Sequence, residues 1–324
     1  MRSFPTRVRV FSGTDDLDLD LFQETALFPG DAVAVLHESQ DKKWVFARSY
    51  HYAAWVPKSD IAMGTREDVL SYHGRDKAYL VVTGDKVETV YTPEDPRVSR
   101  VSLDMGVRLP LIASGTLGHS LNGQNPYTGY AVRLPVRKTE DGTLEFAPAV
   151  IARSRDVSPG YPEFTHHNLI RQSFKFLGER YGWGHDYGGR DCTGFISEIY
   201  RSFGILMPRN SGQQGTSEFG VNIRFDDNAP MREKLEAINT LEPGDLIYIP
   251  GHVMMFLGVD GGTPYVIHSV KGYSHLEPDG TLYSGTLNGV SVTPLTTLHK
   301  SSGTSFIDEI YNLKKIRYPL SDMR

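Results

Sequence analysis

The stretch GGRDCTGFISEIYRSFG, residues 188–204, holds the only cysteine of a chain of 324 residues, together with a helical pattern. Its apolar residues, three or four positions apart, would share one face of an α-helix. They are Phe195, Ile196, Ile199 and Phe203. Asp191 stands where an N-cap is expected, and Gly204 stands where a glycine often follows the C-cap. The stretch therefore predicts a helix that begins at Cys192.

Cys192 would lie in the first turn of that helix. A lone cysteine forms no disulfide within the chain, so its thiol is a buried apolar group, a metal ligand or a nucleophile. The unpaired N–H groups at a helix start favour an anion, so this position is expected to lower the thiol pKa. The same amides can stabilise an oxyanion that develops beside the sulfur. The cysteine alone leaves the apolar and the nucleophilic interpretations open.

Two histidines later in the chain suit a nucleophile. His252 opens the run HVMMFLG, and His268 lies in the next run, YVIHSV, beyond the turn DGGTP. In a hairpin centred near Gly261, His268 lies opposite Met254 and shares a face with His252, whereas a register shift of one residue would separate them. A general base with an orienting partner needs this layout. The alternative, a Cys–His–His zinc site, lacks the closely spaced ligand pairs typical of zinc.

The pattern of apolar runs and turn residues predicts that the chain has three domains. Short runs rich in Val, Phe and Trp, separated by turn residues, predict small all-β barrels at residues 1–63 and 64–155. Residues 156–324 read as helices followed by antiparallel strands, which predicts an α+β domain. The expected strands of the first barrel are TRVRVF, DAVAVLHES, KWVFARS and AAWVP, and those of the second lie within AYLVVTGDKVETVYT, VRLPLIASG, YAVRLPVRK and LEFAPAVIA.

The third domain is expected to begin with a helix that precedes the one at Cys192. Apolar residues recur there at helical spacing, and Gly182 is expected to end the helix. They are Leu169, Ile170, Phe174, Leu177 and Tyr181. Strands are expected later at GDLIYIP, HVMMFLGVD, PYVIHSV and GVSVTPL.

Composition excludes several classes of function. A formal net charge of −5 and the lack of any long basic run argue against a nucleic-acid partner and a polybasic membrane patch. No apolar stretch approaches the roughly 18 residues that span a bilayer, and the start MRSFPTRVRVFSG has no signal-peptide core. The chain is expected to be a monomer, in the cell envelope if a targeting segment has been removed and in the cytoplasm if it is complete.

Several ordered blocks of the sequence resemble a known family. YGWGHDYGGRDCTGF is similar to the Y-x-W-G-G…D-C-S-G-F signature of NlpC/P60 cysteine peptidases, and LEPGDLIYIPGHVMMFLG and YVIHSV resemble later blocks of that family. The resemblance covers roughly residues 165–315. The stretch LFPGDAVAVLHESQDKKWVFARSYHYAAWVPKSDIA resembles the bacterial SH3-type barrels that accompany such peptidases. The resemblance implies a papain-like fold behind two SH3-like barrels.

The resemblance also implies a mechanism and a substrate. It makes Cys192 the nucleophile, His252 the general base and His268 the residue that orients the imidazole, with no metal or organic cofactor. Members with paired SH3-type domains cut peptidoglycan stem peptides between γ-D-glutamate and the diamino acid. In those enzymes the first barrel narrows the groove, which restricts cleavage to short peptides with a free amino terminus. The implied substrate-binding residues are Tyr181, Asp191, Thr193, Asn210, Ser211, Tyr52 and Asp31.

The sequence departs from the family pattern in three places. Thr193 replaces the usual serine and keeps the hydroxyl, while Asn210 stands where an aspartate is common and removes one charge from the amine pocket. Extra residues separate Trp183 from the Asp-Cys pair. Two other functions stay open: a catalytically idle wall-binding protein, which would have no reason to keep all three catalytic residues, and a thiol acyltransferase or amidase.

Overall fold

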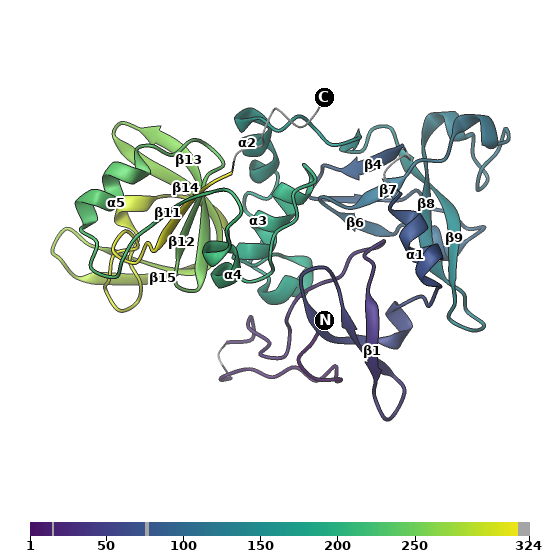
Figure 1. Cartoon of the computed structure of the whole chain (residues 1–324), viewed down its shortest axis with the longest axis horizontal. Coiled ribbons are helices and arrows are strands. Elements are labelled where there is room, and N and C mark those ends of the chain that lie inside the picture. Colours follow the sequence, from purple (N-terminus) through teal and green to yellow (C-terminus); the bar gives the residue numbers. More distant parts are fainter. Residues whose placement is uncertain (15, 75–77, 317–324) are drawn as a thin grey trace. The chain divides into compact units, whose positions relative to one another are not determined.

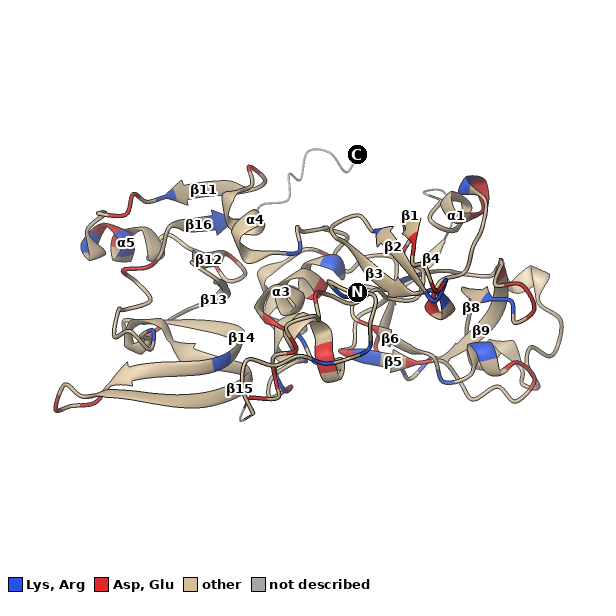
Figure 2. Ribbon diagram, turned by 90° about the horizontal axis from the view of Figure 1, so that it is seen from below, with Lys and Arg blue, Asp and Glu red and all other residues tan. Residues whose placement is uncertain are grey.

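The computed structural model describes residues 1–14, 16–74 and 78–316. A region made mainly of strands comes first and a domain of helices and one large sheet follows, which confirms the α+β fold expected from the sequence (Figure 1). Acidic and basic residues are scattered along the chain between longer uncharged stretches (Figure 2). None of the helices within the described ranges has the length and apolarity needed to cross a membrane.

The chain divides into two compact units. The first comprises Met1–Pro162 with Arg201–Ile205, and the second comprises Glu163–Tyr200 with Leu206–Arg324. The division between the two small β-domains, and the three domain boundaries themselves, stay predictions.

The first unit opens with a three-stranded antiparallel sheet in the order β1-β2-β3. Its strands are β1 (Ala34–Glu38), β2 (Trp44–Arg48) and β3 (Ala53–Pro57). Alternate residues of β2 and β3 point inward, and the sheet buries a small core of Met1, Val45, Ala47, Ala54 and Val56. These strands match three of the four expected from the sequence.

The prediction of a strand at TRVRVF is wrong. The backbone there is held by a side chain, because the buried carboxylate of Asp20 accepts hydrogen bonds from the N–H groups of Val10 (3.1 Å) and Phe22 (3.1 Å) and pairs with Arg2. A carboxylate that satisfies these donors replaces the strand ladder that alternating valines would otherwise favour.

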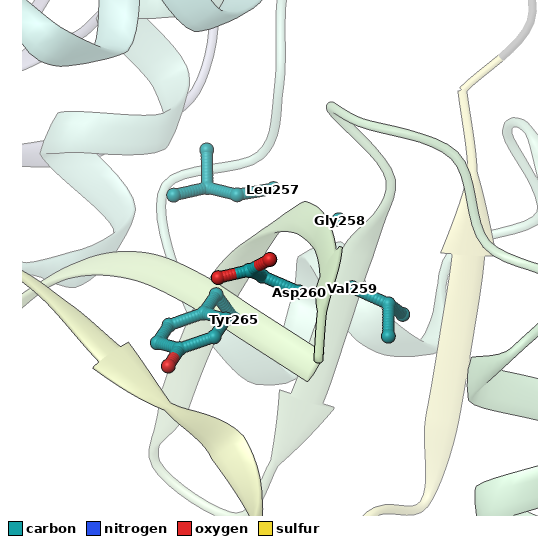
Figure 3. A pocket seen from close by; sticks show the side chains of 5 residues that line it. All are labelled: Leu257, Gly258, Val259, Asp260 and Tyr265. Atoms are coloured by element: carbon teal, nitrogen blue, oxygen red, sulfur yellow. The ribbon is translucent and has the colours of Figure 1, made fainter. Parts of the chain in front are cut away.

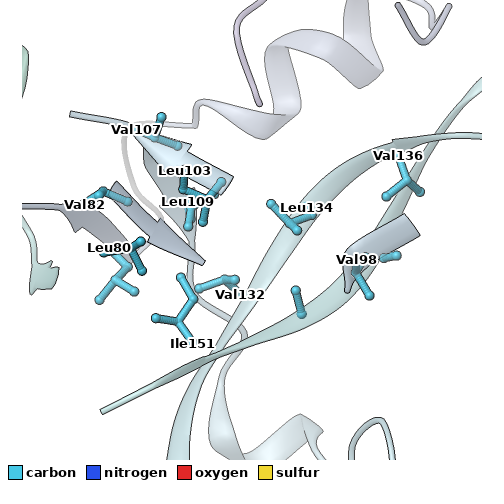
Figure 4. Close-up of a cluster of buried hydrophobic side chains, with 13 residues drawn as sticks. Leu80, Val82, Val98, Leu103, Val107, Leu109, Val132, Leu134, Val136 and Ile151 are labelled. Carbon is cyan, nitrogen blue, oxygen red and sulfur yellow. The ribbon is translucent and has the colours of Figure 1, made fainter. Parts of the chain in front are cut away.

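The remaining strands of the first unit surround a separate buried cluster of aliphatic side chains (Figure 4). Three form a sheet in the order β10-β4-β7, and two antiparallel pairs, β5-β6 and β8-β9, complete the set. The strands are β4 (Tyr79–Val82), β5 (Lys86–Glu88), β6 (Ser102–Asp104), β7 (Arg108–Pro110), β8 (Gly129–Arg137), β9 (Leu144–Ala152) and β10 (Val157–Pro159). Short 3₁₀ turns lie at η1 (Lys58–Asp60), η2 (Pro96–Val98), η3 (Ser114–Thr116) and η4 (Pro126–Thr128).

A helix that the sequence interpretation missed precedes these strands. It is α1 (Arg66–Tyr72), and a capping box starts it: the Thr65 side chain accepts the Asp68 N–H, and the Asp68 side chain accepts the Thr65 N–H. The T-x-x-D spacing is a variant of the usual capping signature, in which the acidic residue is a glutamate.

The second unit carries the predicted helix at the cysteine. It is α3 (Cys192–Arg201), and Asp191 is its N-cap, because Oδ1 of Asp191 accepts the N–H of Gly194 at 2.8 Å. The four apolar residues of the predicted stripe are all buried. Gly204 has a φ of +83°, a left-handed conformation that suits glycine after a helix end.

The helix predicted over Leu169–Tyr181 is shorter than expected. α2 (His166–Phe174) ends early, and Gly178, with a φ of +84°, belongs to the turn that follows. The periodic residues Phe174 and Leu177 are exposed, while Phe176 is buried in their place. Two shorter helices, α4 (Ser211–Thr216) and α5 (Met231–Ile238), follow α3, and the 3₁₀ segment η5 (Trp183–Gly188) lies between α2 and α3.

One six-stranded antiparallel sheet forms the rest of the second unit, in the order β11-β16-β12-β13-β14-β15. The strands are β11 (Val221–Arg224), β12 (Leu246–Ile249), β13 (His252–Asp260), β14 (Thr263–Leu276), β15 (Leu282–Pro294) and β16 (Asn312–Lys315), with a 3₁₀ turn, η6 (Leu295–Thr297), after β15. The long β14–β15 hairpin has acidic residues at its tip (Figure 2). Every residue of β12 is buried. The next two strands in the sheet order, β13 and β14, carry the two histidines expected in the site.

Candidate active site

The helix start and the sheet centre meet at the sulfur of Cys192. The thiol is partly buried and accepts hydrogen bonds from the backbone N–H groups of Thr193 and Val253. Val253 follows His252 at the beginning of β13, so the first turn of α3 lies against the start of that strand. Residues 60 positions apart in the sequence therefore share one site.

The environment of the thiol differs from the sequence expectation. Burial raises the pKa of Cys192 to about 12, and the carboxylate of Asp191 acts in the same direction. The Val253 amide, the Arg209 guanidinium and the Thr193 amide oppose this rise without overcoming it. The expected lowering of the pKa is wrong, chiefly because the thiol is buried, and also because the side chain that caps the helix places a negative charge at the end where the dipole would favour an anion. In the protein alone the sulfur carries its proton.

The partly buried His252, the buried His268 and a threonine form a line of hydrogen bonds across the sheet. Nε2 of His252 lies 2.8 Å from Nδ1 of His268, and Nε2 of His268 lies 3.0 Å from Oγ1 of Thr293 on β15. Both nitrogens of His268 are thereby engaged. On His252 the nitrogen that remains for the thiol is Nδ1, since Nε2 already contacts His268.

The pairing register of β13 and β14 agrees with the predicted hairpin, but it depends on a bulge that the sequence did not reveal. Met255 pairs with Ile267, and one further step places His268 opposite Met254. The turn is centred between Gly261 and Gly262, and a bulge between Phe256 and Gly258 compensates for the difference of one residue.

Burial keeps both imidazoles neutral near pH 7. It lowers the pKa of His252 to about 4. It also lowers the pKa of His268 well below its ordinary value, with a further contribution from a charge on His252. A neutral His252 is able to accept a proton, which a general base requires.

A buried ionic cluster surrounds the helix cap. Oδ1 of Asp191 accepts the hydroxyl of Thr193 at 3.0 Å, and Oδ2 accepts the Gly184 N–H at 3.0 Å and pairs with Arg209. Arg209 also donates to Oγ1 of Thr193 at 2.5 Å. Burial opposes ionisation of Asp191, but Arg209 and then His185 outweigh it and lower the pKa of the carboxyl to about 2. Arg209, which the sequence interpretation missed, lies next to the expected residue Asn210 in the motif PRNSG.

Tyr181 lies close to the thiol. Its side chain is buried, and burial raises its pKa above the ordinary value, with smaller contributions from charges on Cys192 and Asp191. Its backbone is held by a bridge to Arg190 and by a hydrogen bond from its N–H to the carbonyl of Asn288 at 3.0 Å.

The inserted loop before the cysteine is held by a second buried network. Nε2 of His185 contacts Oε1 of Glu198 at 2.9 Å, Nε of Arg190 donates to Oε2 of Glu198 at 2.8 Å, and Arg190 also pairs with Glu179. The sequence interpretation gave His185 no role. A Cβ on Gly182 would lie 2.3 Å from the carbonyl oxygen of Asp186, so the loop folds tightly enough to require glycine there.

The other expected binding residues occupy different settings. Asn210 is exposed and precedes α4 without capping it, and Ser211 is the first residue of that helix. In the first unit, the hydroxyl of Tyr52 donates to Glu24 at 2.5 Å. Asp31, also in the first unit, accepts the N–H of Phe28 at 2.9 Å and pairs with Arg201 at 2.6 Å. Their roles in substrate binding stay predictions.

No group of three or more His, Cys, Asp or Glu side chains within the described ranges is arranged to hold a metal ion. His252 and His268 instead use one ring nitrogen each for the hydrogen bond between them. A hollow of about 340 Å³ in the second unit lies at the β13–β14 turn and is lined by Leu257, Gly258, Val259, Asp260 and Tyr265 (Figure 3). None of the expected site residues lines it.

Comparison with known proteins identifies two regions of the chain. Residues 178–291 match the NlpC/P60 family, and residues 9–57 match the SH3 domain of the SH3b1 type. The first range contains the thiol, both histidines and most of the β14–β15 hairpin. Two separate parts of the chain thus match family models, an SH3b1-type region first and an NlpC/P60 region after it.

Curated relatives are distant but extend beyond a single domain. A Gamma-D-glutamyl-L-lysine dipeptidyl-peptidase of Bacillus cereus is 25% identical over 238 residues, 70% of this chain and 59% of the relative. The chain thus spans less than two thirds of the length of that protein. Dipeptidyl-peptidase 6 of Lysinibacillus sphaericus is 24% identical over 79% of this chain and 83% of its own length.

Two solved structures share the fold. An NlpC/P60 endopeptidase from Photobacterium damselae subsp. piscicida has a TM-score of 0.77 at 18% identity, over 97% of this chain and 70% of that one. An NlpC/P60 family protein from Bacillus cereus has a TM-score of 0.58 at 22% identity, over 90% and 81%.

Proposed function

We propose that this chain is a cysteine peptidase that cleaves peptidoglycan stem peptides between γ-D-glutamate and the diamino acid. The observation that carries the proposal is the line of hydrogen bonds from His252 through His268 to Thr293. This line begins next to the thiol of Cys192, because the N–H of Val253, the residue after His252, donates a hydrogen bond to the sulfur. The names of the curated relatives support the choice of bond. The family shares the arrangement of a thiol and an imidazole.

The first half of the reaction forms a thioester. Nδ1 of His252 takes the thiol proton of Cys192 as the sulfur attacks the γ-carbonyl carbon of D-glutamate. The N–H groups at the start of α3 stabilise the oxyanion, a contribution that is typically worth about 10²–10³ in rate for one donor. The imidazolium then gives its proton to the departing amine of the diamino acid, and the C–N bond breaks.

The second half releases the acid. His252 takes a proton from water, whose oxygen attacks the thioester carbon, and the proton returns to sulfur as the C–S bond breaks. Because Cys192 and His252 begin the cycle neutral, the ion pair forms during attack. A donated hydrogen bond to Nδ1 of His268 holds the imidazole of His252 in the tautomer that leaves Nδ1 free to accept.

The free amine of the substrate would be held by the groups that the resemblance implies. Asp191, Thr193 and Tyr181 lie around the sulfur, and Arg209 ties the first two together. Since Arg209 already neutralises Asp191, this carboxylate offers the amine less charge than an unpaired one. Asn210, Ser211, Tyr52 and Asp31 complete the proposed set.

The direct test is cleavage of L-Ala-γ-D-Glu-diamino acid tripeptides, followed by mass spectrometry of the products. The expected products are L-Ala-D-Glu and the free diamino acid. Cys192→Ala should abolish cleavage and keep the circular dichroism and melting temperature of the parent protein. Turnover by the variant at the parent rate would refute the assignment of the nucleophile.

Product analysis separates the rivals. A thiol acyltransferase would give an acyl product with an added amine nucleophile in place of the free acid, and an amidase would cut a different bond. A parent protein that binds the peptide without cleaving it would be a wall-binding protein, and the proposal would fail. Comparing the free tripeptide with cross-linked wall tests the expected preference for short peptides.

A further inference from the structure

A second hollow, separate from the proposed active site, lies in the first unit. Its volume is about 570 Å³. Segments far apart in the sequence meet around it: the chain near residue 6, the β1–β2 turn, the end of β3 with η1, and the end of β8. The lining residues are Pro5, Thr6, Arg7, Lys42, Lys43, Trp44, Pro57, Lys58, Ser59 and Arg137.

The lining is cationic and contains no acidic residue. Half of its ten side chains are Arg or Lys, in a protein whose formal net charge is −5. Lys58 is paired with Glu38. The other four, Arg7, Lys42, Lys43 and Arg137, have no carboxylate within 4.0 Å in the part of the chain that the structure describes. Like charges gathered around one cavity repel each other, so an anion bound among them gains the attraction of all.

Arg137 points to a ligand independently of the charge count. Its Nε is buried and has no hydrogen-bond partner among the described residues, while Nη1 reaches only the carbonyl of Lys138 at 3.4 Å. Buried side-chain donors are nearly always satisfied, and a guanidinium presents a planar fork that suits phosphate or carboxylate oxygens. An anion in the cavity would give the outer nitrogens of this guanidinium an acceptor that the described residues do not supply.

The apolar part of the lining indicates the kind of chemical group to which the anion is attached. Trp44 is nearly buried, and the guanidinium carbon of Arg7 lies 6.0 Å from the centroid of its ring. Pro57 pairs with Trp44 across the β2–β3 ladder and adds a second flat apolar surface. The apolar side chains form one part of the lining, and the remaining lining residues are polar or charged. The cavity has room for more than an inorganic ion.

We propose that this cavity binds a phosphorylated sugar, with the phosphate among Arg7, Lys43 and Arg137 and the sugar ring against Trp44 and Pro57. The phosphate dianion matches the surplus of positive charge better than a single carboxylate does. The sugar phosphate would be either a free metabolite or a unit of a phosphate-linked sugar polymer. This site does not depend on the proposed peptidase activity.

Calorimetry on the full chain tests the proposal, with glucose 1-phosphate, inorganic phosphate, glucuronate and glucose as probes. Glucose 1-phosphate should bind, inorganic phosphate and glucuronate at least 10-fold more weakly, and glucose undetectably. Binding should weaken several-fold between 50 mM and 200 mM salt, because the attraction between charges is screened. A short oligomer of phosphodiester-linked sugars separates the two sources: tighter binding than the monomer identifies the polymer, and weaker binding identifies the free metabolite.

Variants decide whether this cavity is responsible. Arg137→Gln and Lys43→Gln should each weaken binding about 10-fold, and Lys43, on a turn, keeps the test valid if Arg137→Gln fails to fold. Arg66→Gln, an exposed cation of the same unit outside the cavity, should bind like the parent, as should Cys192→Ala. Failure of glucose 1-phosphate to bind, equal affinity for inorganic phosphate, or unchanged binding by Lys43→Gln would overturn the proposal.

Discussion

The orientation of the histidine pair depends on the side-chain hydroxyl of Thr293. For Nδ1 of His252 to face the thiol as an acceptor, its Nε2 must donate to His268, and His268 must carry its own proton on Nε2. Oγ1 of Thr293, 3.0 Å away, is the acceptor for that proton. The threonine is therefore a positioning residue, because it acts on the reaction through the two imidazoles.

Thr293→Val keeps the shape of the side chain and removes this acceptor. A buried N–H left without a partner costs about 1–3 kcal/mol, so kcat on the tripeptide should fall about 10-fold with little change in KM. Thr293→Ser should recover most of the activity. Steady-state kinetics on the purified variants measure both effects.

A control lies on the same strand. Thr286 is exposed on β15, and Thr286→Val should leave kcat unchanged. An unaltered kcat in Thr293→Val, with the variant folded, would remove the threonine from the hydrogen-bond line.

From single residues the sequence could predict that the two histidines meet, but not the protonation state of the thiol. The shared face of His252 and His268 followed from strand alternation and the turn position. The raised pKa of Cys192 did not, because it depends on burial and on the charge of Asp191, which only the folded environment sets. Thr293 and Arg209 had no distinguishing spacing, and tertiary packing alone brings them into contact with the site.

The loop before α3 contains the residues inserted between Trp183 and the Asp-Cys pair, and the buried network of Glu198 holds it. Gly184, His185 and Tyr187 all have positive φ, near +60°, which is costly for residues other than glycine. Glu198 offsets that cost by accepting from both His185 and Arg190, and the Arg190 carbonyl in turn accepts the hydroxyl of Ser269 on β14 at 2.7 Å.

Glu198→Ala should therefore destabilise the second unit. Removing one partner of a buried ion pair leaves the other charge without full compensation, which typically costs about 3–5 kcal/mol. Because Arg190 keeps its pairing with Glu179, we expect the lower end, about 3 kcal/mol. Urea unfolding measures the change.

The matched control is the exposed pair of Arg232 and Glu236 on α5. Glu236→Ala should change the free energy of unfolding by less than about 0.5 kcal/mol, because solvent screens surface pairs. Equal effects of the two substitutions would mean that the buried network contributes nothing special to the loop.

Element types were easier to predict than element ends. The stripe of α3 and the strands from β12 to β15 followed from periodicity, whereas α2 ends about seven residues before the predicted Tyr181, because Phe174 and Leu177 face solvent despite their spacing. The bulge in β13 leaves no sequence signal beyond Gly258. β11 and β16 are short and partly polar, so alternation alone did not reveal them.

The pair of buried histidines makes the stability of the molecule depend on pH. Burial lowers the pKa of His252 from 6.5 to about 4, so between these values the unfolded chain binds a proton that the folded protein does not. Stability therefore falls as the pH falls through this interval. Asp191 stays ionised throughout, because its pKa is about 2. The loss assigned to His252 alone is about 3 kcal/mol at pH 4.

We expect the free energy of unfolding to drop by about 2–3 kcal/mol for this histidine between pH 7 and 4.5. Urea titrations of the parent and of His252→Gln at both pH values measure it, and the variant should lose clearly less than the parent. His167→Gln, which removes an exposed imidazole from α2, should keep the parent slope. A slope in His252→Gln as steep as in the parent would contradict the neutral burial of this ring.

The position of β16 bears on how the protein is made. This strand, the last one described, lies between β11 and β12 and joins them. Until residue 315 has left the ribosome, the strands that carry both histidines have no link to β11, while the N-terminal strands can already pair. We expect the central sheet of the nascent chain to stay open at one edge, and the chain to remain catalytically silent, until β16 has been synthesised.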